Sequence, residues 1–570
     1  MALAAILPLL STLNAYFIAD DFGLIQLFSA KPPLHFLTLF TSSWVEGIYG
    51  ANADELRPLV ELSYQIDSLW GPANPFGYHV GSIVLHTANA LLVLAIARRL
   101  VGLSWLAAAY AGTAFAVLPV HAEVGAWISG RADSIPAAFY LGTLLTFGLW
   151  RKHAKRKVAV DASGSVIRAG PTDDTGRDIL LFLTSIGLFV AALFSKQSGI
   201  TMAATLVAYD VLVERRLPWS PWRTSLAYVP FLTLTIGYLA LRYLLFGNAV
   251  RESQIVGETF VAFALTQATN LQMVATGSHV LRMDGPWPVL ALIGIGAASV
   301  AILRALPAII RGATPPWVGA ALFFGPVWWI ITVTPLAVTY LSSRHLYLTA
   351  VGFAILLGIA LAALRAAPAR AFRWGVMAAG ASLLVIYALT LHESVDEWNR
   401  SAERSYRMTQ DLWRESAALP PGSLVVFNAP ASNAPIFKWR GVPALGFPED
   451  RPVGAPNPPT WTFIWAWTAP FLYGPPFAPF DLTTRVLLVE PPGVFCCPAD
   501  QWHRRVYDTI SAWETTEDRT PVVVLNWDES GRLTRKAETP ALRAALVRVL
   551  DATNPDETWS RLAEVFDAPP

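Results

Sequence analysis

Long apolar stretches recur through the first 391 residues of the chain and stop at Leu391. An α-helix needs about 20 predominantly apolar residues to cross the hydrocarbon core of a bilayer. The pattern therefore predicts an all-α polytopic membrane domain with about 11 transmembrane helices. We expect these helices at residues 2–18, 77–97, 103–120, 134–150, 179–195, 198–213, 224–246, 287–308, 317–336, 346–364 and 374–391.

After residue 391 the pattern changes to shorter apolar runs separated by polar turns. Runs rich in β-branched residues are typical of strands, and apolar positions spaced three or four apart are typical of helices. Residues 392–570 are therefore expected to form a soluble α/β domain. Its predicted elements are a helix at 393–413, strands at 423–428, 485–490 and 521–527, a turn at 528–531, and helices from Pro540 onward.

Charge is sparse in this chain and unevenly distributed. The 570 residues are 54% hydrophobic and 15% charged, whereas a soluble globular protein carries about 25% charged residues. Residues 1–391 hold 43 charged residues and residues 392–570 hold 40, so charge density roughly doubles at the boundary. A net charge of +1 and the lack of a basic block argue against a nucleic-acid partner.

Basic residues in alternate connections predict the orientation in the membrane. If the N-terminus is cytoplasmic, 17 of the 25 Lys and Arg residues before residue 392 fall on one side, and the positive-inside rule makes that side the cytoplasm. Residues 19–76 then form a long first outer loop, residues 151–178 a cytoplasmic loop, and the C-terminal domain is extracytoplasmic. The first span lacks the features of a cleaved signal peptide, so a retained anchor in a bacterial inner or cell membrane is expected.

Three further stretches complete the predicted layout of the chain. Residues 258–282 are apolar but dotted with amides, so the segment 247–286 is expected at the outer interface; if it spans instead, every later element changes sides. Alternating aromatic residues between 441 and 480 predict a strand resting on the bilayer or on the membrane domain. The adjacent Cys496 and Cys497 suit neither a disulfide framework nor a zinc site.

The predicted outer ends of the first helices carry charged residues suited to chemistry. Asp20 and Asp21 offer two carboxylates, which suit a general base for a hydroxyl or ligands for a divalent cation; an anchoring pair at a helix end is the alternative. Arg57 has a guanidinium that can grip a phosphate with two hydrogen bonds, or pair with Asp54 or Glu61.

The richest cluster is the run from His121 to Asp133, which also contains Glu123 and Arg131. His121 and Glu123 are two residues apart, so joint metal binding requires a bent backbone. Further cations at predicted outer turns suit an anionic lipid headgroup, although a snorkelling lysine is an equally simple reading. These are Lys196, Arg344 with the adjacent His345, and, less clearly, Arg242.

In this order, the clusters resemble the GT-C superfamily of polytopic glycosyltransferases. The similarity is greatest to the dolichyl-phosphate-mannose-type O-mannosyltransferases with tetratricopeptide repeats and to their bacterial relatives. It is carried by Asp20-Asp21-Phe22, Arg57-Pro58-Leu59, the run from Phe76 to Leu91, the run from His121 to Asp133, Ser195 to Ile200, and Arg344 to Leu348. The chain departs from the family in having an α/β domain where the repeats would be.

The resemblance implies an enzyme that moves a monosaccharide, with a mannosyl-type donor favoured, from a polyprenyl phosphate to a hydroxyl on a protein, glycan or lipid at the outer face. It places the catalytic carboxylate at Asp20 or Asp21. A multi-span transporter and a non-catalytic membrane assembly or sensor protein remain as alternatives.

Besides the catalytic carboxylate, the candidate roles are phosphate binding, substrate orientation and metal binding. Phosphate binding is assigned to Arg57, Arg131, Lys196 and Arg344, and substrate orientation to His121, Glu123, Asp133 and His345. The cofactor is open: a divalent cation would take ligands from Asp20, Asp21, His121 and Glu123. The sugar, the acceptor and the stereochemistry do not follow from residue types.

Overall fold

The computed structural model describes most of the N-terminal two thirds of the chain and parts of the remainder. The described residues are 1–18, 20–29, 31–45, 54–156, 158–160, 166–168, 174–216, 222–250, 267, 270–277, 304, 307–308, 311, 314–338, 342–420, 422–428, 485–489, 499–515, 520–527 and 532–567. The expected strand between 441 and 480, both cysteines and the turn at 528–531 lie outside them, as do about two thirds of the stretch 258–282 and nearly all of 287–308.

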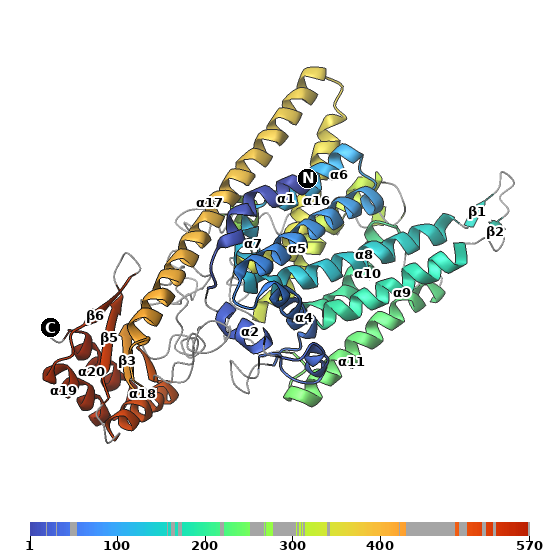
Figure 1. Ribbon diagram of the computed structural model, residues 1–570. Coiled ribbons are helices and arrows are strands. Elements are labelled where there is room, and N and C mark those ends of the chain that lie inside the picture. Colours follow the sequence, from blue (N-terminus) through green and yellow to red (C-terminus); the bar gives the residue numbers. More distant parts are fainter. Residues whose placement is uncertain are drawn as a thin grey trace.

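A bundle of long apolar helices forms the body of the molecule (Figure 1). Its main helices are α5 (Pro75–Ile96), α6 (Trp105–Val117), α8 (Arg131–Arg156), α9 (Asp174–Leu193), α10 (Met202–Leu212), α11 (Val229–Phe246), α14 (Pro316–Leu322), α15 (Trp328–Val333), α16 (Tyr347–Arg365) and α17 (Arg370–Ser416). Short elements join them: α1 (Ala2–Ile6), η1 (Leu7–Asn14), η4 (Ala97–Val101), η7 (Gln197–Thr201), η8 (Trp222–Tyr228), η9 (Phe323–Val327), η10 (Thr334–Val338) and η11 (Ser343–Leu346).

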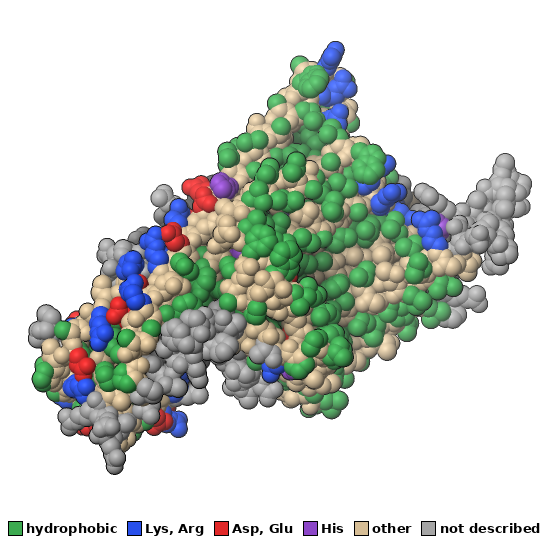
Figure 2. Space-filling model, in the orientation of Figure 1, with side chains coloured by type: hydrophobic (Ala, Val, Ile, Leu, Met, Phe, Trp, Pro, Cys, Tyr) green, Lys and Arg blue, Asp and Glu red, His purple; other side chains and the backbone are tan. Residues whose placement is uncertain are grey.

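Six helices of the described residues are long and apolar enough to cross a membrane, or seven if the bent pair Trp105–Val117 and Pro119–Ala126 is counted as one span. The chain is therefore a multi-pass membrane protein, and Figure 2 shows hydrophobic side chains covering the bundle. The expected count of 11 is not confirmed. At residues 2–18 the helix is a shorter one, Ala2–Asn14, and at residues 198–213 the α-helix α10 has only 11 residues.

Two ion pairs mark the two ends of α8. Near its N-terminus Asp133 pairs with Lys196, which follows α9, and near its C-terminus Arg151 pairs with Asp210 of α10 at 2.6 Å. We call the end with Asp133 the site end and the other the opposite end. At the opposite end the Lys152 ammonium donates to the carbonyl of Arg99 at 2.8 Å, so the contacts group basic residues from separate connections as expected. Which end faces the cytoplasm stays a prediction.

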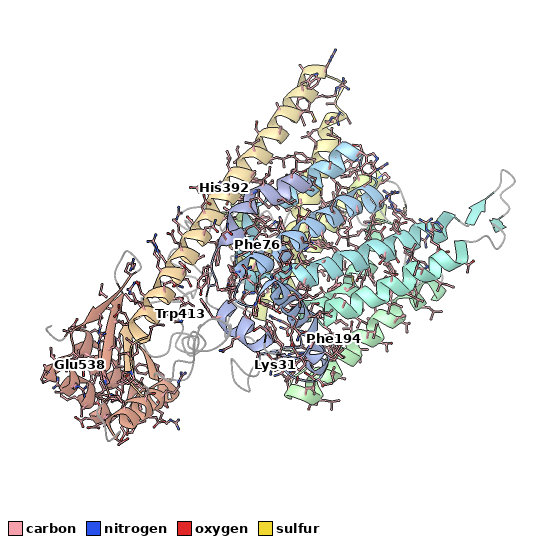
Figure 3. The ribbon with its side chains drawn as sticks, in the orientation of Figure 1. Lys31, Phe76, Phe194, His392, Trp413 and Glu538 are labelled. Atoms are coloured by element: carbon pink, nitrogen blue, oxygen red, sulfur yellow. The ribbon has the colours of Figure 1, made fainter. Side chains whose placement is uncertain are left out.

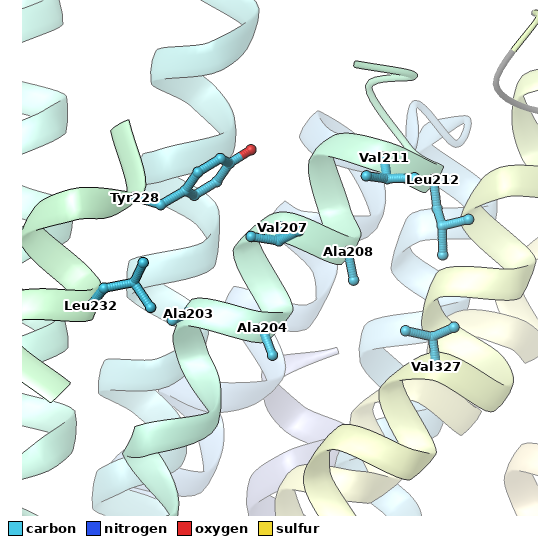
Figure 4. A pocket seen from close by; sticks show the side chains of 9 residues that line it. All are labelled: Ala203, Ala204, Val207, Ala208, Val211, Leu212, Tyr228, Leu232 and Val327. Atoms are coloured by element: carbon cyan, nitrogen blue, oxygen red, sulfur yellow. The ribbon is translucent and has the colours of Figure 1, made fainter. Parts of the chain in front are cut away.

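The Arg151–Asp210 pair is buried and completed by aromatic groups. Tyr228 donates its hydroxyl hydrogen to Asp210, and the Arg151 guanidinium lies 4.8 Å from the ring centroid of Trp150. Beside it an apolar cavity of about 560 Å³ runs along α10 (Figure 4). It is lined by Ala203, Ala204, Val207, Ala208, Val211, Leu212, Tyr228, Leu232 and Val327, so none of the candidate site residues contributes to it.

A long loop covers the site end of the bundle before α5. Its described elements are α2 (Asp20–Ser29), η2 (His35–Phe40), α4 (Pro58–Asp67) and η3 (Ser68–Trp70). Phe40 packs on Phe194 after α9, with ring centroids 4.7 Å apart, and Figure 3 shows Phe194 in the same region as Lys31 of this loop. The next helix begins with Pro75 at its first position, and the Asn74 side chain accepts from the Phe76 amide.

The longest helix connects the bundle to the C-terminal part of the chain. α17 is 47 residues long and continues without a break through the expected boundary at residues 391 and 392. Figure 3 shows His392 midway along α17 and Trp413 near its far end, beside the C-terminal elements. The expected span 374–391 and the expected helix 393–413 are thus one helix. The division of the chain into two domains stays a prediction.

Beyond α17 the chain forms a four-stranded sheet with helices packed on it (Figure 1). The strand order is β4-β3-β5-β6; β3 is parallel to β4 and β5, and β6 is antiparallel to β5. Leu424 pairs with Arg485 and Val522, so the three strands expected from the sequence are present. The elements are β3 (Leu424–Asn428), β4 (Arg485–Val489), α18 (Ala499–Glu514), β5 (Val522–Trp527), β6 (Leu533–Lys536), α19 (Pro540–Arg548), η14 (Val549–Asp551) and α20 (Pro555–Asp567), and a separate hairpin is formed by β1 (Val158–Val160) and β2 (Val166–Arg168).

The buried pair at the opposite end predicts a large effect on stability. Asp210→Ala leaves the Arg151 guanidinium without its carboxylate in a buried site, so we expect a loss of about 3–5 kcal/mol. The measurement is denaturant unfolding in detergent micelles. Glu564→Ala removes a partner of Arg548 from an exposed pair and should cost at most about 1 kcal/mol. Equal effects of the two changes would contradict this assignment.

Candidate active site

One buried stretch, residues 119–133, forms the centre of the site. It folds as three short helical turns, η5 (Pro119–His121), α7 (Ala122–Ala126) and η6 (Ile128–Gly130), before α8 begins. The turns pack so closely that a Cβ atom on Gly130 would lie 2.8 Å from the Cα atom of Val124. Every residue of this stretch is buried. Because buried polar groups must be hydrogen-bonded or paired, its side chains have to find partners on other elements.

The last residue of the stretch gathers two cations. Asp133 pairs with Lys196, and its Oδ2 atom lies 3.8 Å from the Nε atom of Arg344. Burial is the main influence on the pKa of Lys196 and lowers it; Asp133 acts in the opposite direction, and the positive charges of Arg57 and Arg344 lower it further. Lys196, Arg344 and Arg57 therefore form one group of positive charges, which we call the cation group.

Glu123 holds the segment that carries one of these cations. Its carboxylate accepts hydrogen bonds from the Ser342 hydroxyl at 2.7 and 2.8 Å, from the Ser343 hydroxyl, and from the backbone amide of Arg344 at 3.1 Å. The Arg344 Nε atom lies 3.8 Å from Glu123 Oε1. Glu123 thus fixes the backbone of Arg344.

Arg57 belongs to the first outer loop and is held there by two neighbours. Its guanidinium donates to Glu55 at 2.7 Å and lies 4.9 Å from the ring centroid of Trp44. The indole of Trp44 donates to the other oxygen of Glu55 at 2.8 Å. The expected pairing with Asp54 or Glu61 is not the one formed, because Asp54 pairs with Arg242 at 2.8 Å and Glu61 with His35 at 2.8 Å.

The two adjacent aspartates have different surroundings. Asp21 is buried; one oxygen accepts from the Ile18 amide at 3.0 Å, and the other from the amide of Ser129 at 3.0 Å and from its hydroxyl. Burial raises the pKa of Asp21 to about 7, although the hydrogen bonds from Ser129 and Ile18 oppose this effect. Asp20 is only half-buried, in the first turn of α2.

Arg131 is not directed at the cation group. Its guanidinium pairs with Asp67, donates to the carbonyl of Tyr78 at 2.7 Å, and lies 4.7 Å from the ring centroid of Tyr64. Its side chain is fully buried. These contacts suit a residue that joins α8 to α4 and α5, and the phosphate-binding role expected for Arg131 stays a prediction.

The two histidines have different surroundings. His121 is buried among aromatic rings, with its centroid 4.4 Å from that of Phe115 and 4.6 Å from that of Tyr347. His345 is half-buried, and its backbone amide donates to Ser342 at 3.2 Å. Among the residues that the structure describes, no group of three or more His, Cys, Asp or Glu is arranged to hold a metal ion.

The structure thus joins most of the predicted residues through one stretch of chain. Glu123 and Asp133 meet Arg344, Asp133 meets Lys196, and Ser129 meets Asp21. Sequence reasoning assigned no role to Ser129, Ser342 or Ser343. Ser129 lies within a quoted motif and Ser342 and Ser343 directly precede one, but a hydroxyl carries no signal of its distant partner.

The raised pKa of Asp21 predicts a pH-dependent stability. The folded state binds this proton more tightly than the unfolded state does, so the carboxyl group's contribution to stability is present at low pH and lost as pH rises through about 7. Asp21→Asn cannot ionise. Its stability relative to the native chain should therefore improve between about pH 5 and pH 8, by on the order of 2–4 kcal/mol. Thermal unfolding in detergent at both pH values measures this, and parallel profiles would contradict it.

Comparison with known proteins identifies a similarity to protein O-mannosyl-transferases. The chain is 32% identical over 216 residues to protein O-mannosyl-transferase Tmtc1 of Drosophila melanogaster, covering 37% of this chain and 22% of that protein. It is 30% identical over 218 residues to TMTC2 of Homo sapiens, covering 36% and 23%. The chain thus spans less than a quarter of the length of these relatives. No family model matches it.

Two solved structures have a partial likeness to the chain. ArnT from Cupriavidus metallidurans, bound to undecaprenyl phosphate, aligns with a TM-score of 0.45 and 13% identity over 93% of this chain and 92% of that one. The oligosaccharyltransferase AglB from Archaeoglobus fulgidus aligns with a TM-score of 0.39 and 13% identity, over 74% and 62%. The O-mannosyl-transferase relatives confirm the resemblance predicted from the motifs, over about a third of the chain.

Proposed function

We propose that the chain is a membrane glycosyltransferase that moves a monosaccharide from a polyprenyl phosphate to a hydroxyl acceptor at its outer face. A mannosyl-type donor is proposed from the similarity to O-mannosyl-transferases. The observation that carries the proposal is that residues 119–133 link an aspartate pair to a group of cations at one end of a membrane bundle. These are the parts that transfer from a glycosyl phosphate needs.

The reaction makes three demands on the protein. The acceptor oxygen forms a bond to the anomeric carbon while the bond from that carbon to the phosphate oxygen breaks. The acceptor hydroxyl must give up its proton to a base, and the leaving phosphate gains negative charge. The protein must therefore supply a base, stabilise the phosphate and align the two substrates.

Asp20 is the better candidate for the base. Both oxygens of Asp21 already accept hydrogen bonds from Ile18 and Ser129, which makes it a residue that positions the chain. Asp20 is half-buried and stands in the first turn of α2, where the helix dipole favours an ionised carboxylate. An ionised carboxylate is the form that can accept a proton.

The cation group is the proposed site for the donor phosphate. Lys196 and Arg344 share Asp133, and both side chains are largely but not fully buried. A phosphate of the donor can take charge-assisted hydrogen bonds from both, since each has donors beyond those that Asp133 uses. Asp133 keeps the two cations together, and Glu123 holds the backbone of Arg344.

The proposed roles predict different effects for substitutions of Asp20 and Asp21. Asp20→Asn removes the base and should lower kcat by about 10²–10⁴-fold, with donor binding largely unchanged. Asp21→Asn should act on the protein's stability and pH profile more than on proton transfer. The measurement is transfer of labelled sugar from a polyprenyl-phosphate donor by purified protein, with Glu564→Gln on the exposed surface as control. Full activity of Asp20→Asn would remove it as the base.

A second experiment distinguishes the roles proposed for Lys196 and Arg344 from that of Arg131. Lys196→Ala and Arg344→Ala should each weaken binding of a polyprenyl phosphate by on the order of 1.5–3 kcal/mol, the value of a charge-assisted hydrogen bond. Arg131→Ala should destabilise the fold instead, because it leaves Asp67 unpaired. Binding to detergent-solubilised protein and its melting temperature are measured together. If Arg131→Ala alone weakens binding, the assignment of the phosphate site is wrong.

A further inference from the structure

Trp127 occupies the middle of the central stretch but belongs to none of its helical turns. Its backbone is extended, with φ −93° and ψ 122°, between α7 and η6. The side chain is almost fully buried. A buried tryptophan at a break between two turns has its indole directed at other elements, and three contacts show where it goes.

The edge of the indole is bound to the segment before the aspartates. Its Nε1–H group donates to the carbonyl of Ile18 at 3.2 Å. The amide of the same residue, Ile18, donates to Asp21 at 3.0 Å. Trp127 therefore binds the carbonyl of Ile18, while the amide of the same residue binds Asp21 of the aspartate pair.

The face of the indole supports the cation group. The guanidinium carbon of Arg344 lies 4.8 Å from the ring centroid of Trp127. A guanidinium over an indole is the strongest of the common cation–π arrangements. Arg344 is thus fixed by Trp127 in addition to Glu123 and Asp133.

The indole itself is held in place by α17. Trp398 stacks on it with ring centroids 6.0 Å apart and an interplanar angle of 13°. About two turns further along α17, Ser405 donates to the carbonyl of Phe17 at 2.7 Å. The helix therefore backs both Trp127 and the segment that leads to Asp20.

We infer that Trp127 is a positioning residue that sets the distance between the aspartate pair and the cation group. The inference rests on the proposed function, since it matters only if acceptor and donor phosphate bind to these two groups. Its single rigid ring contacts both sides, through Ile18 and through Arg344. Loss of either contact should then have a different and measurable effect on the reaction.

Two substitutions of Trp127 test its contact with Ile18 and its contact with Arg344 separately. Trp127→Phe keeps an aromatic face for Arg344 and Trp398 but loses the hydrogen bond to Ile18. It should lower kcat by about tenfold through misalignment of the base, while the affinity for polyprenyl phosphate stays near the native value. Trp127→Leu also loses the aromatic face, so it should in addition weaken the affinity several-fold.

Trp328 provides the matched control. It is equally buried, and its Nε1–H group donates to the carbonyl of Leu348 at 3.0 Å, away from both groups. Trp328→Phe therefore loses the same kind of bond, and kcat and donor affinity should remain at native levels. Melting temperatures in detergent show whether the two Phe variants lose similar stability.

The outcomes distinguish this inference from the proposed function. An active native protein with kcat of Trp127→Phe equal to that of Trp328→Phe would overturn the positioning role alone. Equal reductions of affinity in Trp127→Phe and Trp127→Leu would also overturn it, because the face and the edge would not act separately. A native protein that neither binds polyprenyl phosphate nor transfers sugar would overturn the proposed function itself.

Discussion

The need to satisfy buried polar groups in residues 119–133 determines how the site is built. Several polar side chains of this stretch are paired with different, distant parts of the chain: Glu123 with Ser342 and Ser343, Ser129 with Asp21, and Arg131 with Asp67. An unpaired charge in such a place would cost several kcal/mol. The same contacts that remove this cost bring the elements of the site together.

The apolar bundle explains why this happens at one end of the molecule. Helices that cross a membrane satisfy their own backbone groups and expose apolar side chains to lipid, so charged residues collect where the helices end. α8 illustrates the rule, with Asp133 near one end and Arg151 near the other. The two ends differ in kind: Arg151 is enclosed by Asp210 and aromatic rings, whereas Lys196 and Arg344 keep a fraction of their side chains exposed.

The sequence predicted which residues belong to the site better than it predicted the partners of those residues. The motifs around Asp20, His121 to Asp133, Lys196 and Arg344 were all recognisable, because charged residues beside apolar spans stand out. Their roles depend on contacts between residues more than 200 positions apart, such as Glu123 with Ser342. No local pattern encodes those contacts, so the pairing of Arg131 with Asp67 was not foreseen.

The fold, too, was predicted in part from the sequence. Strands β3, β4 and β5 followed from runs of β-branched residues, and most long apolar helices from hydropathy. The continuity of α17 did not, because its composition changes from apolar to charged near Leu391 while its helical backbone does not. Composition reports the expected surroundings of a helix, and the structure shows that one helix continues across the change in composition without interruption.

The most direct test of the central claim is a cryo-EM structure of the native protein with a bound polyprenyl phosphate. The account predicts a phosphate in contact with Lys196 and Arg344, on the side of residues 119–133 that faces Asp20. A phosphate bound elsewhere, for example beside Tyr228 at the end of the α10 cavity, with both cations still on Asp133, would contradict it.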